Sequence, residues 1–290
     1  MLGCLIKEFS FNDLDERIKF LLIVFFLIIG VIYSQFSQDS NKRSRVYSAT
    51  YNQYIQPLAL SGEGITNVSF GFKELIADYY WLKTIQYYGG GDPNGKYEQL
   101  PKLYNSVLEL SPRFLSAYES GILILGGEGF VKDAINLANV GQKNLPLSWQ
   151  IPYYQGLIEH IYNKNYKAAA NLFDQAAKLP GAPPNTKYFA GIYYSQANNP
   201  DIAYAIFKTI YENSTDPAIK ERAGNYVIYL ENVTLLNKAL TQYKIKFSKP
   251  PNSLSDLVKQ KIITEIPQNP LEFDYYYDKK IGKVLTAKPL

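Results

Sequence analysis

Apolar and polar positions follow a helical period over most of this chain, and the pattern repeats. A tyrosine followed three positions later by glycine occurs three times at a constant step of 35 residues. These pairs are Tyr118 with Gly121, Tyr153 with Gly156, and Tyr188 with Gly191. Prolines mark the series 34 residues apart, at Pro112, Pro146 and Pro180. A period of this length predicts stacked helical hairpins rather than an enzyme domain with a single core.

Small and large side chains follow each glycine, at positions expected on the second helix of a pair. In chain order they are Ala134, then Ala169, Phe173 and Ala176, then Ala203 and Phe207. A glycine inside a helix costs about 1 kcal/mol relative to alanine, so three glycines in register indicate a steric requirement. We expect the glycines and alanines to let two helices approach closely, and the aromatic residues to fill the space between pairs.

Further helices are expected on both sides of these repeats. A stripe with a 3.6-residue period predicts the first helix of a degenerate leading repeat, with its apolar residues at Phe72, Leu75, Ile76, Tyr79, Leu82 and Ile85. Asn199 and Asp216 each precede a proline, which is typical of a helix N-cap. From Pro217 to Phe247 the pattern predicts one long helix that caps the last repeat.

The final 40 residues change character. Pro250 and Pro251 end the long helix, and Ser253 with Asp256 resembles a capping box that opens a short helix. Short extended strands are expected at 262–263, 267–270, 273–277 and 283–286, with a turn at 278–282.

The N-terminal region carries the longest apolar run of the sequence. Residues 20–33 read FLLIVFFLIIGVIY, and the range 18–36 gives about 19 residues, or roughly 28 Å of helix, close to the hydrocarbon thickness of a bilayer. A retained signal anchor, a cleaved signal peptide and a buried soluble helix remain alternatives, and we favour the anchor. Positive residues flank both ends about equally and do not decide the orientation. Since short N-terminal tails usually stay inside, we expect a single-pass protein of the cell membrane with its repeats outside the cytoplasm, in the periplasm of a bacterium.

The expected fold is mainly α: an N-terminal transmembrane helix, an α-solenoid of helical hairpins and a small α+β C-terminal extension. The expected organisation is an N-terminal tail (1–17), a transmembrane anchor in the lipid bilayer (18–36), a linker (37–69), helical repeats (70–216), a long capping helix (217–247) and an α+β tail (248–290).

The composition argues against several classes of function. The 290 residues carry a formal charge of +4 without a clustered basic stripe, so no nucleic-acid binding is expected. Cys4 and His160 are the only cysteine and histidine, which argues against a disulfide, a metal site or a catalytic triad. Gly90 and Gly95-Lys96 approach a phosphate-binding loop, but Tyr97 stands where Ser or Thr is needed. We therefore expect no enzyme activity, cofactor or metal.

The repeat residues resemble the tetratricopeptide repeat family over about 113–214, with a weaker copy at 70–112. The third copy matches best, through Tyr153, Gly156, Ala169, Phe173, Ala176 and Pro180. The second copy departs from the pattern, because Ala138 stands where an aromatic residue is usual. The resemblance implies a curved helical stack whose concave groove binds peptide segments or partner helices. Tyr154 and Tyr194, the second members of tyrosine doublets, are candidates for lining it, since tyrosine is favoured at interfaces.

The tail resembles the C-terminal part of the major pseudopilin of type II secretion. The shared features are Pro251-x-x-Leu254-x-x-Leu257, Ile266-Pro267-x-x-Pro270, the strand Tyr275–Tyr277 and Gly282-x-Val284. Asn269-Pro270 replaces the usual Asp-Pro, and the family's calcium-binding acids are not recognisable. The resemblance implies a fold for the tail and no metal site.

These features lead to a functional hypothesis. We expect a membrane-anchored scaffold or adaptor that binds partner proteins in the cell envelope. The pseudopilin resemblance alone implies a role in assembling a secretion, pilus or transport complex. The alternative is a periplasmic ligand- or peptide-binding accessory protein of a transporter. An enclosed apolar cavity would favour that alternative, whereas an open groove would favour the scaffold.

Overall fold

The structure, a computed structural model, describes residues 29, 72–90 and 96–286 of the chain. The chain divides into two compact units, Met1–Gln56 and Pro57–Leu290. All the helices and strands discussed below belong to the second unit.

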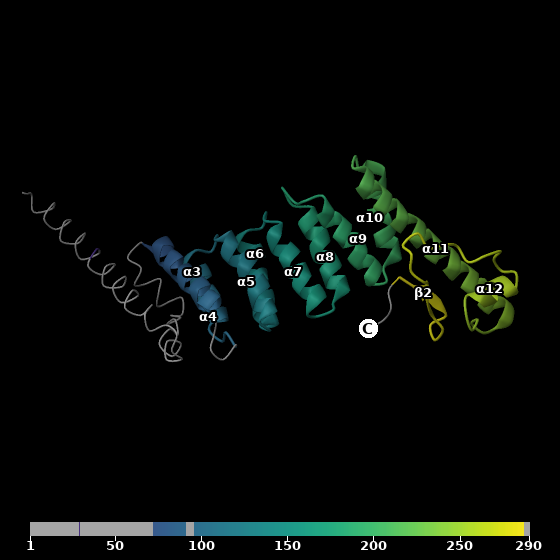
Figure 1. Cartoon of the computed structure of the whole chain (residues 1–290), viewed down its shortest axis with the longest axis horizontal. Coiled ribbons are helices and arrows are strands. Elements are labelled where there is room, and N and C mark those ends of the chain that lie inside the picture. Colours follow the sequence, from purple (N-terminus) through teal and green to yellow (C-terminus); the bar gives the residue numbers. More distant parts are fainter. Residues whose placement is uncertain (1–28, 30–71, 91–95, 287–290) are drawn as a thin grey trace, which may run out of the picture. The chain divides into compact units, whose positions relative to one another are not determined.

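This unit is mainly α, as the sequence predicts. Its helices are α3 (Lys73–Gly90), α4 (Leu100–Leu110), α5 (Leu115–Gly127), α6 (Val131–Asn144), α7 (Gln150–Ile161), α8 (Tyr166–Ala177), α9 (Asn185–Gln196), α10 (Pro200–Asn213), α11 (Pro217–Phe247) and α12 (Ser255–Lys259). The two strands are β1 (Tyr276–Asp278) and β2 (Lys283–Leu285). From α3 to α11 each helix packs against the next, and Figure 1 shows them side by side in chain order.

The three repeated glycines occupy matching positions in their hairpins. A Cβ atom at any of them would press against a large side chain on the second helix of the same pair. The contacts are Gly121 with Leu137 at 2.5 Å, Gly156 with Phe173 at 3.1 Å, and Gly191 with Phe207 at 2.8 Å. The close approach of the two helices therefore needs glycine here, which is the steric requirement expected from the sequence.

The hairpin of α5 and α6 differs from the two that follow it in sequence but keeps the same kind of contact. Leu137 follows Gly121 by the same 16 residues that separate Phe207 from Gly191, so leucine takes the place of the aromatic residue. Ala138, where an aromatic was looked for, is fully buried beside it. Gly141, also on α6, leaves space for the ring of Tyr118. A Cβ atom added to Gly141 would lie 2.8 Å from Cδ1 of that ring.

The other predicted packing residues lie in or against the core. The fully buried ones are Tyr118, Ala134, Ala169, Phe173, Ala176, Ala203 and Phe207. Tyr153 and Tyr188 are half-buried, and their rings meet Phe173 and Phe207 edge-on, with centroids 5.1 and 5.3 Å apart. Edge-to-face pairs of this kind stabilise beyond the area they bury.

Helix α7 joins two clusters of core residues. Ile151 and Ile158 belong to the cluster formed with α3 to α6. Tyr153 and Leu157 pack against the cluster that continues through α8 to α11 and the tail. Because one helix supplies both faces, the row of hairpins has a continuous apolar interior.

Helix α3 buries a different face from the one that the sequence pattern predicts. Its buried residues are Ala77, Tyr80 and Thr84, whereas most of the predicted stripe is exposed. Both faces of this helix carry apolar side chains, so periodicity alone could not select the inner one. The small side chains of Ala77 and Thr84 fit the face that packs against α4.

The two proline-marked helix starts are confirmed with different capping. Asp216 accepts hydrogen bonds from the backbone N–H groups of Ala218 and Ile219 at the start of α11. Asn199 occupies the N-cap position of α10, but its amide donates to the Ala197 carbonyl instead of capping the helix. The long helix α11 runs between the bounds expected from the sequence.

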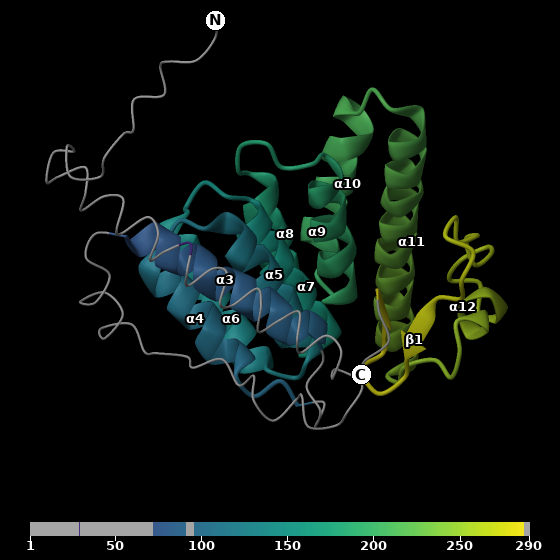
Figure 2. The same cartoon turned by 60° about the vertical axis from the view of Figure 1, so that its left-hand side comes forward.

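The tail folds back on the C-terminal half of α11 (Figure 2). Strands β1 and β2 pair antiparallel, with Tyr277 opposite Val284. Asp278 accepts from the N–H groups of Lys280 and Ile281 and so forms the predicted turn. The expected strands at 262–263 and 267–270 are wrong: these residues form turns and irregular backbone. Ile262 and Ile263 pack against the core there without a pairing strand.

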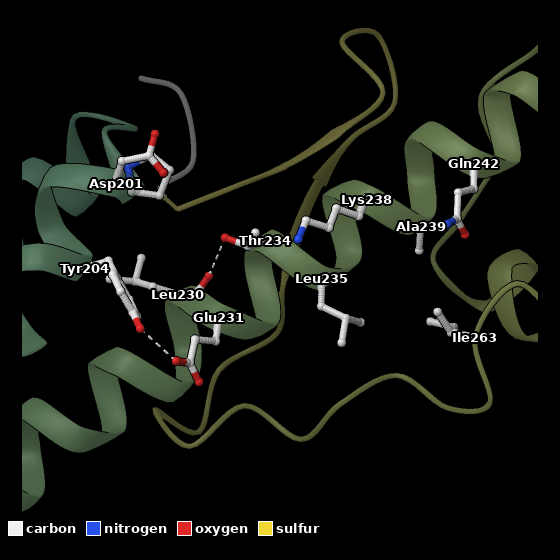
Figure 3. Close-up of a pocket in the computed structure, with 11 residues that line it drawn as sticks. Asp201, Tyr204, Leu230, Glu231, Thr234, Leu235, Lys238, Ala239, Gln242 and Ile263 are labelled. Atoms are coloured by element: carbon white, nitrogen blue, oxygen red, sulfur yellow. Dashed lines mark hydrogen bonds between the residues drawn. The ribbon is translucent and has the colours of Figure 1, made fainter.

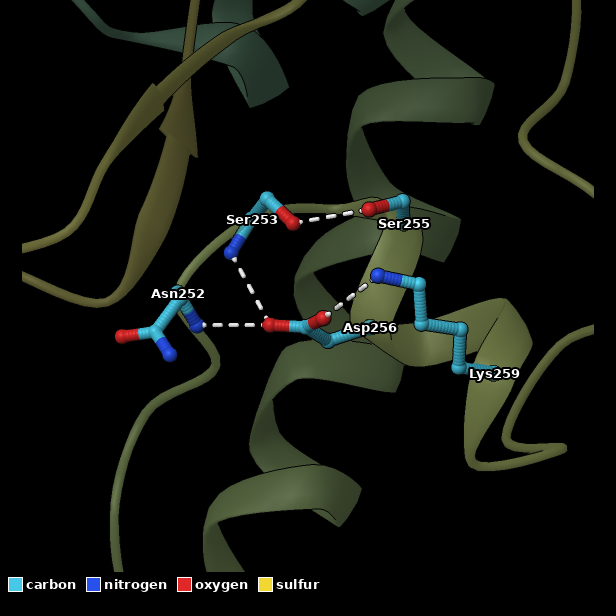
Figure 4. A network of polar contacts seen from close by, with 5 residues as sticks. All are labelled: Asn252, Ser253, Ser255, Asp256 and Lys259. Atoms are coloured by element: carbon cyan, nitrogen blue, oxygen red, sulfur yellow. Dashed lines mark hydrogen bonds and ion pairs between the residues drawn. The ribbon is translucent and has the colours of Figure 1, made fainter.

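A short helix precedes the strands. At α12 the carboxylate of Asp256 accepts the N–H groups of Asn252 and Ser253, at 2.9 and 3.3 Å, as in the predicted capping box (Figure 4). The hydroxyl of Ser253 pairs with Ser255 rather than with the helix backbone. Desolvation opposes ionisation of Asp256, but these N–H bonds and Lys259 outweigh it and lower its pKa.

One side chain of α11 ties the strands to the helix. The amide of Asn237 accepts from the Val284 N–H at 2.8 Å and donates to the Val284 carbonyl at 3.0 Å. It therefore binds the outer edge of β2 as a neighbouring strand would. Beyond β2, the Thr286 N–H donates to Asn198 in the turn between α9 and α10.

Replacing Asn237 by leucine is expected to lower the free energy of unfolding by about 2–3 kcal/mol, because the N–H and C=O of Val284 lose their partner. Urea unfolding followed by circular dichroism measures the change. Asn213→Leu is the matched control, since Asn213 donates an exposed hydrogen bond to the Thr209 carbonyl at the end of α10. Its loss should stay below about 1 kcal/mol. Equal losses in the two variants would show that Asn237 does not hold the strand.

The predicted N-terminal tail (1–17), anchor (18–36) and linker (37–69) lie outside the described residues, apart from Ile29. Within the described ranges, no helix is both long enough and apolar enough to cross a membrane. The longest, α11, carries charged side chains along its length, among them Glu221, Glu231 and Lys238. This finding contradicts the predicted single-pass localisation at the cell membrane with periplasmic repeats, which is corrected accordingly.

Candidate functional site

The two tyrosines expected to line a groove differ in their surroundings. Tyr154 on α7 is half-buried, and burial, followed by the charge of Glu119, raises its pKa. Tyr194 on α9 is only 8 % exposed, and its hydroxyl donates to Asn171 at 2.7 Å. Tyr194 is thus a packed residue with a satisfied hydroxyl, which leaves little of its surface for a partner.

A groove of about 580 Å³ lies elsewhere, between the start of α10, the middle of α11 and the loop after α12 (Figure 3). It is partly open to solvent. Its lining residues are Pro200, Asp201, Tyr204, Leu230, Glu231, Thr234, Leu235, Lys238, Ala239, Gln242 and Ile263.

The groove exists because α11 is longer than its neighbour. Helix α10 has 14 residues and α11 has 31, and Asn213 and Pro217 are joined by a short turn. The antiparallel partner of α11 therefore stops at Pro200, while α11 continues toward Phe247. The tail covers the remaining part, and the groove lies where α10 ends and the tail begins.

The middle of the groove is apolar. Leu230 and Ala239 are buried at its base. Leu235 is 47 % exposed, and Ile263 lies across from it on the loop (Figure 3). A half-exposed leucine inside a hollow is a surface that an apolar side chain of another molecule could cover, which is favourable at about 25 cal/mol per Å².

Charged side chains of both signs line the groove. Asp201, Tyr204 and Glu231 lie toward one end, and the Tyr204 hydroxyl donates to Glu231 at 3.0 Å. Gln242 lies toward the other end, and the Lys238 ammonium lies between the two ends, directed toward Thr234. The groove can therefore hold an apolar group together with a cationic and an anionic one, and its lining contains neither a cysteine nor a histidine for nucleophilic chemistry.

Part of this site could be recognised from the spacing of residues along the chain. Glu231, Thr234, Leu235, Lys238 and Gln242 recur at helical spacing on one face of α11 and could have been grouped. The residues from α10 and from the loop at Ile263 are distant in sequence. Glu231 accepts a hydrogen bond from Tyr204 at the groove, a contact that helical spacing alone does not predict.

The remaining sequence candidates offer no reacting group. His160 lies against the rings of Tyr166 and Tyr193, and burial, followed by the charge of Lys164, lowers its pKa. Most of the loop between Gly90 and Lys96 lies outside the described residues. In the part of the chain that the structure describes, no cluster of three or more His, Cys, Asp or Glu side chains could hold a metal ion.

Comparison of this chain with protein-family models, with curated proteins and with solved structures gives no match.

Proposed function

We propose that this protein is a helical-repeat scaffold that binds a segment of a partner protein in the groove between α10, α11 and the tail. The fold proposed for it is an α-solenoid of tetratricopeptide-like hairpins capped by α11. The matching contacts of Gly121, Gly156 and Gly191 support the repeat architecture. Non-enzymatic recruitment fits a groove whose lining residues include no grouped nucleophile and base.

The single observation that carries the binding proposal is the half-exposed Leu235 in an apolar hollow lined by charges of both signs. A complementary segment has a central apolar residue, a basic residue near Asp201 and Glu231, and an acidic residue near Lys238. Polar groups at the ends would fix its direction, while the apolar middle would supply most of the affinity. The partly open form of the groove favours an extended or helical segment over an enclosed small molecule.

The test is a selection of random peptides displayed on phage against the immobilised full chain. Enriched peptides are then measured against Leu235→Asp and Ile245→Asp. Ile245 lies on the same helix outside the groove and is 78 % exposed. We expect Leu235→Asp to weaken binding about 30-fold or more, the equivalent of about 2 kcal/mol for a lost apolar contact.

The control variant Ile245→Asp should stay within about twofold of the wild type, because it changes the charge of α11 without touching the groove. Both variants should keep the wild-type circular dichroism spectrum, since both side chains are exposed. Peptides that bind Leu235→Asp as well as the wild type would refute the proposal.

A further inference from the structure

The outer face of α3 carries a row of exposed apolar side chains. They are Phe72, Leu75, Tyr79, Leu82 and Ile85, each between 42 % and 66 % exposed. The opposite face of α3 packs against α4 through Ala77, Tyr80 and Thr84. A contiguous exposed apolar row of this length is unusual on a folded protein and marks a surface that binds a partner.

The spacing of the row matches a coiled-coil seam. Phe72, Leu75, Tyr79 and Leu82 follow one another by three, four and three residues, which are the intervals between a and d positions of a heptad. Gln86 takes the next a position, where a polar residue is known to fix register at some cost in stability. Ile85 lies on the edge of the seam.

The charges beside the seam select the orientation of a partner helix. Asp78 directly precedes the a position of Tyr79, and Lys83 directly follows the d position of Leu82, so they occupy g and e positions. In a parallel pair, a g residue of one helix faces the e residue that lies five positions later in the partner helix. Asp78 of each copy therefore lies opposite Lys83 of the other copy. In an antiparallel pair, like positions face each other, and each charge meets its own copy.

We propose that α3 is a self-association surface through which two copies of this chain form a parallel, two-fold symmetric dimer. The partner that fits the seam is thus a second α3. The helix is already held in place by α4, so association does not have to meet the cost of forming it. Two heptads bury less than a standard interface, and we expect a dissociation constant in the micromolar range.

The first test is sedimentation velocity of the full chain over a range of concentrations. Leu82→Asp places a carboxylate in the seam and should weaken the dimer by at least about 30-fold, as the loss of a buried apolar anchor does. Leu147→Asp is the matched control, because Leu147 is 69 % exposed in the turn between α6 and α7. It should stay within about twofold of the wild type. A wild type that is monomeric, or a dimer unaffected by Leu82→Asp, overturns the proposal.

The second test asks whether the helices are parallel. Asp78→Lys and Lys83→Asp each set like charges against each other at two sites and should weaken self-association about tenfold at low salt. Mixing the two variants restores opposite charges at both sites. The mixture should therefore form heterodimers at least as tightly as the wild type forms homodimers. A mixture that stays as weak as the separate variants overturns the parallel arrangement.

Discussion

Replacing Phe207 by alanine should lower the free energy of unfolding by about 3–5 kcal/mol, the usual cost of deleting a buried aromatic ring. Phe207 is fully buried on α10. Its ring stacks on Tyr226 of α11 with centroids 4.2 Å apart and meets Tyr188 of α9 edge-on. The deletion therefore removes contacts between three successive helices at once.

Guanidinium unfolding followed by circular dichroism measures this loss. Phe273→Ala is the matched control, because Phe273 is 50 % exposed on the tail and packs only partly against Tyr229. It should cost about 1 kcal/mol. A loss below about 1.5 kcal/mol for Phe207→Ala would mean that this ring does not join the last hairpin to α11.

The second large effect is expected at the glycine that faces this ring. Gly191→Leu should destabilise the protein by about 3 kcal/mol, since overpacking a close helix contact displaces both backbones. Even a single Cβ at Gly191 would lie 2.8 Å from Cζ of Phe207 and 3.0 Å from Cε2 of the same ring. The gain in helix propensity of about 1 kcal/mol relative to glycine does not offset this collision.

Gly89→Ala separates packing from propensity. Gly89 lies within α3, and apart from its chain neighbours and the backbone of its own helix nothing lies within 4 Å of the position of an added Cβ. Alanine there should raise stability by about 0.5–1 kcal/mol.

The double variant Gly191→Leu with Phe207→Ala should lose at least about 1 kcal/mol less than the sum of the single losses, because the leucine fills the space left by the ring. Additive losses would show that the two positions are not packed together.

Much of the helical architecture follows from local signals. A proline after Asp216 and the double proline at 250–251 define α11, and caps and prolines act within one turn. The glycine positions could be predicted as close contacts because glycine is unfavourable in a helix without a steric reason. The partner of Gly121 was not predicted, because an aromatic residue was expected there. Leu137 fills with an aliphatic side chain the position that Phe173 and Phe207 fill with aromatic rings.

Other features depend on tertiary choices that no local pattern encodes. Helix α3 has two apolar faces, and only packing against α4 decides that Ala77 and Thr84 are inside. In the tail, Ile262 and Ile263 are apolar enough for a strand, but only β1 and β2 find partners in register. The residues that line the groove lie between positions 200 and 263. They come together only because α11 packs beside both α10 and the tail, so no local pattern predicts the groove.

The central claim is that the groove holds a segment of another protein, and site-specific photo-crosslinking in the native cells tests it most directly. The photoreactive amino acid p-benzoylphenylalanine is introduced at position 235 in the groove and, as control, at the exposed position 245 of the same helix. If the groove binds a partner, position 235 gives a discrete crosslinked product that is absent from position 245 and is lost when Lys238 and Glu231 are both reversed in charge. Identical products from both positions, or no product from position 235, would contradict it.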